Sequence, residues 1–278
     1  MTGGRVLVGI TVATAVVLGA VSCGGDDGGD GAAVSADERT STTGTTTTTT
    51  TAPLPFREAL VVRFGDELGD GALTAEMVDA LGVDAVQRLH QEVGDEVATD
   101  PLLAYQPPTV PDDEVDSLVV FAFGNRVAAD GSLSPGPVNQ DLADVTAAFV
   151  AEHPVPVFAQ WEVADLLLQQ GVPDVTSIDP DTGPDGEVVY LSTAGVAEKA
   201  VALADAVGVD LGQVGVVCFA DHAGRCVLTA EEAGMDAAVP EGVALPSTYD
   251  PESGQEWTRD RLAYLTTDLQ GRLLALDG

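Results

Sequence analysis

The sequence predicts a three-layer α/β/α protein, in which a mostly parallel sheet lies between helices and a small helical segment precedes it. Three observations predict this fold. From Asp116 onward, short apolar runs alternate several times with amphipathic helical segments. The apolar runs are continuous, which is typical of strands buried on both faces of a parallel sheet. The chain has 278 residues, 45% of them hydrophobic, so the part beyond the first 55 residues can bury the core of one large domain.

Residues 1–22 have the pattern of a secretion signal. Arg5 precedes an apolar run from residue 6 to residue 21, and small residues lead up to Cys23. The pattern resembles a bacterial lipoprotein signal, in which Cys23 would carry the lipid. An uncleaved membrane anchor, an ordinary secretory signal and a wrongly assigned start are the alternatives, but the run is short of the ~20 residues that a spanning helix needs. We therefore expect a lipid-anchored protein on the extracytoplasmic face of the cell membrane.

Residues 23–55 are predicted to form a disordered tether. The segment is poor in aliphatic residues and rich in Gly, Asp and Thr, so it cannot offset the entropy lost on ordering. Ten of the twelve residues from Thr40 to Thr51 are Thr, a tract that is open to O-glycosylation in a secreted protein.

Residues 56–115 are predicted to form a small helical subdomain. Apolar residues recur at helical spacing in FREALVVRF and in LTAEMVDALGVDAVQRLHQEV. Thr74 is the expected N-cap of the second stretch. His90 is expected at the surface or at the edge of the core. The prolines Pro107 and Pro108 end the helical pattern.

Residues 116–278 are predicted to form the α/β domain. The expected strands are 117–123, 155–159, 174–178, 187–191, 214–220 and 235–239. The expected helices are 138–152, 162–170, 194–207, 222–233 and 255–276. In such a sheet, ligands bind outside the carboxyl ends of the strands, where the loops carry polar side chains.

Composition excludes several classes of function. With 45 acidic and 11 basic residues the net charge is -34, so we expect no binding to nucleic acid, whose phosphates require basic side chains. An acidic coat for solubility and a high-salt habitat both account for this charge. The sequence lacks Gly-x-Gly-x-x-Gly after a strand, Gly-Lys-Ser/Thr and Gly-x-Ser-x-Gly, so a dinucleotide enzyme, an NTPase and a lipase are disfavoured and no cofactor is expected.

Cysteine and histidine spacing bear on disulfides and metals. If Cys23 is lipidated, Cys218 and Cys226 remain as a pair in an oxidising compartment. A helix that folds back over its own strand can bring them together, so a disulfide and two buried free thiols are both open. The three histidines show no ligand spacing, and we expect no metal site.

Polar residues follow four of the predicted strands. They are Asn125 after the first, Gln160-Trp161-Glu162 after the second, Ser192-Thr193 after the fourth and Asp221-His222 with Arg225 after the fifth, while Asn139 opens the first helix. Because parallel strands end at the same edge, we expect these side chains to converge on one pocket. The alternative is that each of them only caps a helix or packs.

Four short motifs occur in a fixed order across residues 116–274. They are Asp130-Gly131-Ser132-Leu133-Ser134, Glu162 with Gly171-Val172-Pro173, Ser192-Thr193, and Asp221-His222-Ala223-Gly224-Arg225 with Gly234. Their order and spacing resemble the YdcF/SanA/ElyC family of bacterial envelope proteins. The resemblance implies a Rossmann-like fold, an envelope location and a role in cell-wall or envelope-precursor metabolism.

The sequence departs from this family at two places. The Ser-Gly-Gly turn usual after the second strand is Ala159-Gln160-Trp161, and the Arg usual near the start of the first helix is absent. Both features suit an anionic ligand, so their loss weakens the case for a phosphate-bearing substrate.

The residue types suggest roles in such a pocket. His222 can exchange a proton near neutral pH, and Glu162 is its expected carboxylate counterpart in acid–base catalysis. Arg225 offers a planar fork to a carboxylate or phosphate. The other expected ligand-binding residues are Asn125, Asn139, Gln160, Trp161, Ser192, Thr193, Asp221 and Arg259.

The segment 249–259 allows two interpretations. It could be a lid over the strand edge that offers Gln255 and Arg259 to a ligand. Alternatively, it is a helix entry that Ser253 caps, with Trp257 beginning the apolar stripe of the last helix.

Two classes of function follow from the sequence. The first is an envelope enzyme that acts on a small polar or anionic precursor. The second is a lipid-tethered binding or scaffold protein that keeps the pocket without the chemistry.

Overall fold

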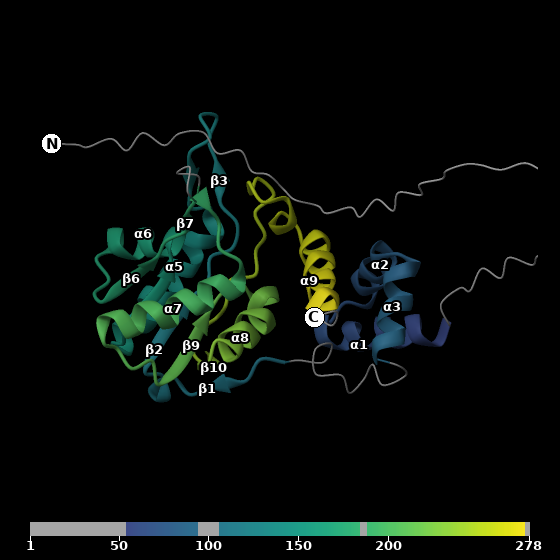
Figure 1. The fold of residues 1–278 in the computed structure, drawn as a ribbon, viewed down its shortest axis with the longest axis horizontal. Coiled ribbons are helices and arrows are strands. Elements are labelled where there is room, and N and C mark those ends of the chain that lie inside the picture. Colours follow the sequence, from purple (N-terminus) through teal and green to yellow (C-terminus); the bar gives the residue numbers. More distant parts are fainter. Residues whose placement is uncertain (1–53, 94–105, 184–187, 276–278) are drawn as a thin grey trace, which may run out of the picture. The chain divides into compact units, whose positions relative to one another are not determined.

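The computed structural model describes residues 54–93, 106–183 and 188–275 (Figure 1). The predicted signal at residues 1–22, the predicted lipidation site Cys23 and nearly all of the predicted tether lie outside these residues. The first described helix, α1 (Leu54–Leu68), begins just inside the segment that the sequence assigned to the tether.

Six parallel strands form the central sheet, in the order β1-β10-β9-β2-β5-β6. They are β1 (Thr109–Val110), β2 (Ser117–Val120), β5 (Val157–Gln160), β6 (Val175–Ile178), β9 (Gln213–Val217) and β10 (Asp236–Pro240). Helices connect most of these strands, as parallel pairing requires. The predicted fold class, a Rossmann-like parallel α/β sheet preceded in the sequence by a helical segment, is confirmed.

Helices cover both faces of the sheet. They are α5 (Pro137–Glu152), α6 (Trp161–Gln170), α7 (Thr193–Val207) and α8 (Ala223–Glu232). α5 and α6 contribute to one hydrophobic core, whereas α7 and α8, which cross in front of the sheet in Figure 1, contribute to the other. Along β2 the side chains alternate between them, since Leu118 and Val120 enter the first core and Val119 enters the second. Two covered faces explain why the strands read as continuous apolar runs.

Three helices form the segment that precedes the sheet in the sequence. They are α1, α2 (Gly71–Leu81) and α3 (Val83–Val93). The prediction that Thr74 caps the second helix was wrong: Asp70 is the N-cap, and its carboxylate accepts hydrogen bonds from the amides of Ala72 and Leu73. Thr74 is buried and donates its hydroxyl hydrogen bond to the Asp70 carbonyl. His90 lies on α3 beside the ring of Phe56.

Two strand assignments from the sequence differ from the structure. Residues 187–191 were expected in the sheet, but β8 (Val188–Val189) pairs antiparallel with β7 (Asp181–Thr182) in a separate hairpin. A hairpin pairs neighbours in sequence and closes a short loop, which a crossover cannot do. The edge of the sheet is instead occupied by β1, which lies in the segment that the sequence assigned to the helical subdomain.

The last helix is shorter than the sequence suggested. A 3-10 turn, η3 (Glu256–Thr258), precedes α9 (Arg261–Ala275), and the Asp260 carboxylate accepts a hydrogen bond from the amide of Ala263. α9 contacts α2, and its buried Tyr264, Leu265 and Leu269 join the same core as α1 and α5. None of the helices in the described ranges is both long and apolar enough to cross a membrane.

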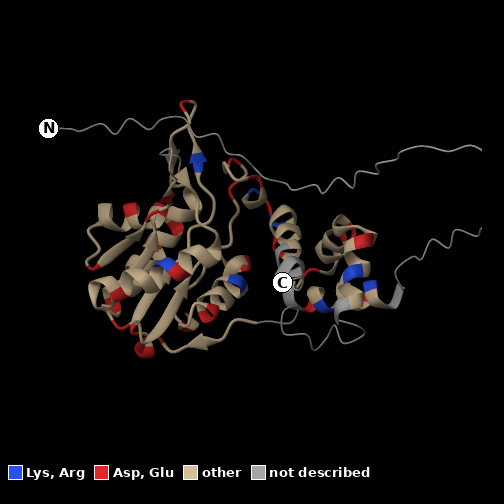
Figure 2. Cartoon of the chain, viewed as in Figure 1, with Lys and Arg blue, Asp and Glu red and all other residues tan. Residues whose placement is uncertain are grey.

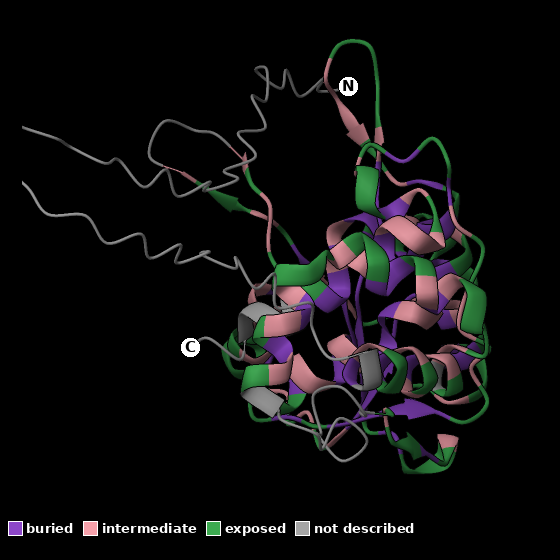
Figure 3. Ribbon diagram, turned by 90° about the vertical axis from the view of Figure 1, so that its right-hand side faces the viewer, coloured by how far each residue is buried: buried purple, intermediate pink, exposed green. Residues whose placement is uncertain are grey.

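A second hairpin follows the first central strand. It consists of β3 (Arg126–Val127) and β4 (Leu133–Ser134), with the predicted Asp130-Gly131 motif in its turn. Both hairpins are mostly exposed or half-buried, whereas buried residues concentrate in the sheet and on the helix faces turned toward it (Figure 3). Acidic residues recur in loops and helices across the described chain (Figure 2), consistent with the net charge of -34.

Candidate functional site

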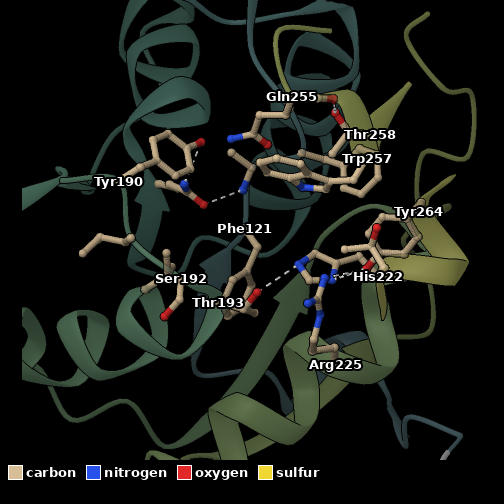
Figure 4. A pocket seen from close by; sticks show the side chains of 17 residues that line it. Phe121, Tyr190, Ser192, Thr193, His222, Arg225, Gln255, Trp257, Thr258 and Tyr264 are labelled. Atoms are coloured by element: carbon tan, nitrogen blue, oxygen red, sulfur yellow. Dashed lines mark hydrogen bonds between the residues drawn. The ribbon is translucent and has the colours of Figure 1, made fainter. Parts of the chain in front are cut away.

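The order of strands reverses between β2 and β9. From β2 the chain adds β5 and β6 on one side, and it then returns to add β9 and β10 on the other. The loops after β2 and β9 therefore diverge, and this is where open α/β sheets bind ligands. A cavity of about 290 Å³ lies at this point (Figure 4).

The cavity brings together the ends of the strands and the C-terminal segment. Its lining consists of Phe121, Ala122, Phe123, Gly124, Gln160, Tyr190, Leu191, Ser192, Thr193, Val196, His222, Arg225, Gln255, Trp257, Thr258, Tyr264 and Thr267. Of the eleven residues that the sequence predicted as catalytic or ligand-binding, five are among them: Gln160, Ser192, Thr193, His222 and Arg225. Asn125, Asn139, Trp161, Glu162, Asp221 and Arg259 are not.

Two of the residues outside the cavity lining, Asn125 and Asn139, hydrogen-bond within or to the loop after β2. The Asn139 side chain, fully buried on α5, accepts a hydrogen bond from the Phe123 amide at 2.9 Å and donates one to the Gly124 carbonyl at 2.8 Å. The carbonyl of Asn125 accepts the amide of Gly254 at 2.7 Å. Neither Asn125 nor Asn139 is part of the cavity lining, although the Asn125 side chain hydrogen-bonds Tyr190, which is.

Gln160, at the end of β5, hydrogen-bonds both the loop after β2 and Tyr190. Its Oε1 accepts a hydrogen bond from the Ala122 amide at 3.1 Å, and its Nε2 donates one to the Tyr190 hydroxyl at 3.1 Å. The Tyr190 hydroxyl in turn donates to Oε1 of Glu162. Tyr190 lines the cavity and Glu162 does not, so the phenol stands between the carboxyl group and any ligand.

Burial governs the protonation of this pair. Glu162 is fully buried, and its Oε2 has no hydrogen-bond partner among the described residues. Burial raises the pKa of Glu162 to about 7, although the hydrogen bond from Tyr190 opposes this. Burial, followed by the charge of Glu162, raises the pKa of Tyr190 well above its usual value, so the phenol remains a donor at neutral pH. The carboxyl group can therefore gain or lose a proton near neutrality.

His222 faces the cavity from the other side. Its Nδ1 lies 2.6 Å from the Tyr264 hydroxyl, and its Nε2 lies 3.5 Å from Oγ1 of Thr193, at the start of α7 (Figure 4). Burial, followed by the positive charge of Arg225, holds the pKa of His222 well below its usual value. The imidazole is therefore neutral at neutral pH, with one nitrogen acting as donor and the other as acceptor.

The guanidinium of Arg225 is paired within the protein. Its Nε lies 2.9 Å from Oδ1 of Asp268 on α9, and its Nη2 donates to the Tyr264 hydroxyl at 3.1 Å. The Asp268 side chain is only 4% exposed, so this carboxylate compensates the charge of Arg225 at short range. The sequence-based role of Arg225 as an anion-binding fork is weakened, because its charge already has a partner.

Segment 249–259 forms one wall and is fixed in place. Arg126 of β3 forms ion pairs with Asp250 at 2.6 Å and Glu252 at 2.5 Å. Gln255 lines the cavity, as the lid interpretation expected, but Arg259 turns away and donates to the Ser253 carbonyl at 2.7 Å. The alternative interpretation was wrong on the cap, because α9 begins at Arg261, beyond the turn that Ser253 supports.

The remaining predicted residues support neighbouring elements. Asp221 accepts hydrogen bonds from the Tyr249 hydroxyl at 2.8 Å and from Nε of Arg261 at 3.0 Å, and so joins the loop after β9 to the C-terminal segment. Trp161 opens α6 with its indole nitrogen buried and without a partner among the described residues. Neither residue reaches the cavity.

Sequence reasoning missed Tyr190, Tyr264 and Asp268. Tyr190 belongs to a run that was interpreted as a central strand, and in such a strand a tyrosine is ordinary core. Tyr264 and Asp268 lie on one face of α9, four residues apart, and this spacing was the available signal. Nothing in the sequence relates that face to β9, so the signal could not be assigned to the pocket.

Cys218 and Cys226 are free thiols, both buried, beside β9 and on α8. Of the two alternatives that the sequence left open, the structure has the free thiols and not the disulfide. Burial, followed by the hydrogen bond with Cys218, raises the pKa of Cys226 well above its usual value, so this thiol is protonated and unreactive in the folded chain.

The described residues contain no group of three His, Cys, Asp or Glu side chains that could hold a metal ion. Comparison with known proteins found no match among models of protein families, among curated proteins or among solved structures. The candidate site is therefore defined by its own geometry: a neutral imidazole, hydroxyls, amides and aromatic rings around a cavity at the point where the strand order reverses.

Proposed function

We propose that this chain is a lipid-anchored, extracytoplasmic protein of the YdcF-like type, whose pocket binds a small polar molecule of the cell envelope and acts on it by proton transfer. One observation carries the proposal. Side chains that end β5, that follow β9 and that open α7 surround a single cavity with His222 in its wall. In an open α/β sheet this is the expected place for a substrate.

The chemistry proposed is general base catalysis by His222. The imidazole is neutral at neutral pH, since burial lowers its pKa. When Nδ1 donates its hydrogen to the Tyr264 oxygen, Nε2 presents its lone pair to Thr193 and to the cavity. Nε2 then accepts a proton from a ligand hydroxyl or from the Thr193 hydroxyl. Gln160, Ser192 and Gln255 are the groups that would orient the ligand.

Turnover of candidate ligands by the full chain tests the proposal. The chain is incubated with nucleotide sugars, muropeptides and polyprenyl phosphates, and products are followed by mass spectrometry. We expect one class to be converted by the wild type and by His153→Ala, in which a partly exposed histidine at the end of α5 is lost. His222→Ala should lose this conversion. Equal turnover by His222→Ala, or no turnover of any class, would overturn the catalytic role.

A second function, ligand binding without catalysis, is favoured by the position of Glu162. The acid–base pair expected from the sequence is not assembled in the cavity, because Tyr190 separates the carboxyl group from it. A compound that raises the melting temperature of the full chain without being converted would support this second function. A compound that is both bound and converted would support the first.

The proposed location has its own test at Cys23. A bacterial host that expresses the full chain is grown with labelled palmitate. We expect label in the wild type, in the membrane fraction, and none in Cys23→Ser. Equal labelling of both chains, or none in the wild type, would contradict lipidation at this residue.

A further inference from the structure

The charge around the cavity is balanced. Arg225 is the one lining residue, among those described, that carries a full charge at neutral pH, and Asp268 compensates it at 2.9 Å. His222 is neutral, because burial lowers its pKa. Glu162, which Tyr190 separates from the cavity, is an acid. An anionic ligand would therefore meet no uncompensated positive charge here, and it would approach a chain whose net charge is -34.

The polar groups that remain suit a ligand with several hydroxyls. Ser192 uses its oxygen to accept the Gly195 amide, which leaves the hydroxyl hydrogen as a donor. Thr193 and Gln255 also line the cavity; the Thr193 hydroxyl lies 3.5 Å from Nε2 of His222, and the Gln255 side chain hydrogen-bonds Tyr190, which leaves further donors and acceptors on both groups. Hydroxyls and amides both donate and accept, as the hydroxyl groups of a ligand do, and such pairs fix orientation without charge.

An aromatic wall faces these groups. Trp257, on the short η3 turn, lines the cavity and is nevertheless 43% exposed, one of few large apolar side chains in the described chain that are so open. Figure 4 shows its indole on one side of the cavity and Ser192 and Thr193 on the other. A ligand that covered the indole would remove apolar surface from water, and a flat ring with an apolar face does this best.

The size of the cavity limits the ligand. About 290 Å³ is at the lower end of the range for small-molecule sites, which suits one ring rather than a nucleotide sugar or an oligosaccharide. A larger molecule would place only one unit inside.

We propose that the cavity binds a neutral pyranose sugar ring, which stacks on Trp257 while its hydroxyls contact Ser192, Thr193 and Gln255. This inference rests on the proposed function in one respect, because it takes the same cavity as the site, and it narrows the ligand to an uncharged monosaccharide unit. It sets aside the anionic alternative that the sequence left open, since the charge of Arg225 is already compensated by Asp268.

Tryptophan fluorescence of the full chain tests the inference. The sequence has two tryptophans, so Trp161→Phe leaves Trp257 as the only indole. We titrate this variant with glucose, N-acetylglucosamine and glucose 1-phosphate. A neutral sugar should change the emission in a saturable way, and glucose 1-phosphate should bind about tenfold more weakly, since it adds a charge without a partner.

Calorimetry on variants assigns the contacts. Trp257→Ala, a change at a partly exposed side chain, should weaken binding of the neutral sugar about tenfold or more, and Gln255→Ala several-fold. The control is Val207→Ala, which changes an exposed residue at the far end of α7 and should leave affinity unchanged.

Three results would overturn the inference: no saturable change with either neutral sugar, tighter binding of glucose 1-phosphate than of glucose, or unchanged affinity in Trp257→Ala. None of them decides the proposed function, which requires that some polar envelope molecule binds in the cavity and reacts there by proton transfer. That function is decided separately by the turnover of the wider panel and by His222→Ala.

Discussion

Glu162 should make the stability of this protein fall as pH rises through the weakly acidic range. Its pKa is raised from 4.5 to about 7 in the folded chain, chiefly by burial. Between these two values the folded state holds a proton that the unfolded state has released. Stability therefore decreases with increasing pH across this window, is unaffected by this group below pH 4.5 and reaches its full penalty above pH 7.

The size of the penalty follows from the two pKa values. They differ by about 2.5, and each pH unit corresponds to about 1.4 kcal/mol, so the buried carboxylate costs roughly 3 kcal/mol at pH 8. Glu162→Gln removes the ionisation and keeps an oxygen that can accept the Tyr190 hydrogen bond. The variant should match the wild type near pH 4.5 and exceed its stability by about 3 kcal/mol at pH 8.

Urea unfolding of the two full chains at several pH values between 4.5 and 8 measures this difference. The many other carboxylates of the chain titrate in both proteins, so they cancel when the two are compared at the same pH. Glu232→Gln, a change of an exposed carboxylate on α8, should show no such pH-dependent gain. A difference between Glu162→Gln and wild type that stays constant over this range would refute the reasoning.

Three further perturbations have direct expectations. Asp268→Asn leaves the charge of Arg225 without its carboxylate; because Arg225 is 30% exposed, we expect a loss of about 3 kcal/mol, the low end for a buried pair, by urea unfolding. Gly124→Ala should cost roughly 2–4 kcal/mol by the same measurement, since φ is +72° and a Cβ would lie 2.5 and 2.7 Å from two side-chain hydroxyls. Cys218 and Cys226 should react with a thiol reagent only after unfolding, in a chain that carries Cys23→Ser so that no other thiol is present; rapid reaction of the folded chain would contradict their burial.

The fold could be predicted where the sequence pattern depends on local burial. Leu118, Val119 and Val120 are all buried because both faces of β2 are covered, and this produces the continuous apolar run that marks a central strand. The pattern failed at 187–191, where an equally apolar run pairs with residues 181–182 and leaves Val189 exposed. The apolar content of a strand therefore does not predict which strand it pairs with.

The part of the candidate site at the strand ends could be predicted for a different reason. Gln160 ends β5 and His222 follows β9, and the topology of a parallel sheet places such residues at one edge whatever their contacts are. Asn139 was expected there on the same ground, but it is bound from two sides by the loop after β2 and cannot turn outward. Position after a strand thus identifies an edge, and the hydrogen bonds of each residue decide whether it faces a ligand.

The side of the cavity that the C-terminal segment forms determines which ligands the pocket can bind, and no local sequence pattern predicts that this segment lies there. Trp257 and Tyr264 come from the C-terminal segment, which Arg126 holds through its ion pairs with Asp250 and Glu252. The same segment carries the carboxylate that pairs with Arg225. From the strand ends alone, an imidazole and a guanidinium side by side suggest an anion site. Once α9 adds its acid and its phenol, the imidazole is neutral and the guanidinium is compensated, so selectivity shifts from charge to hydroxyl groups and a stacking face.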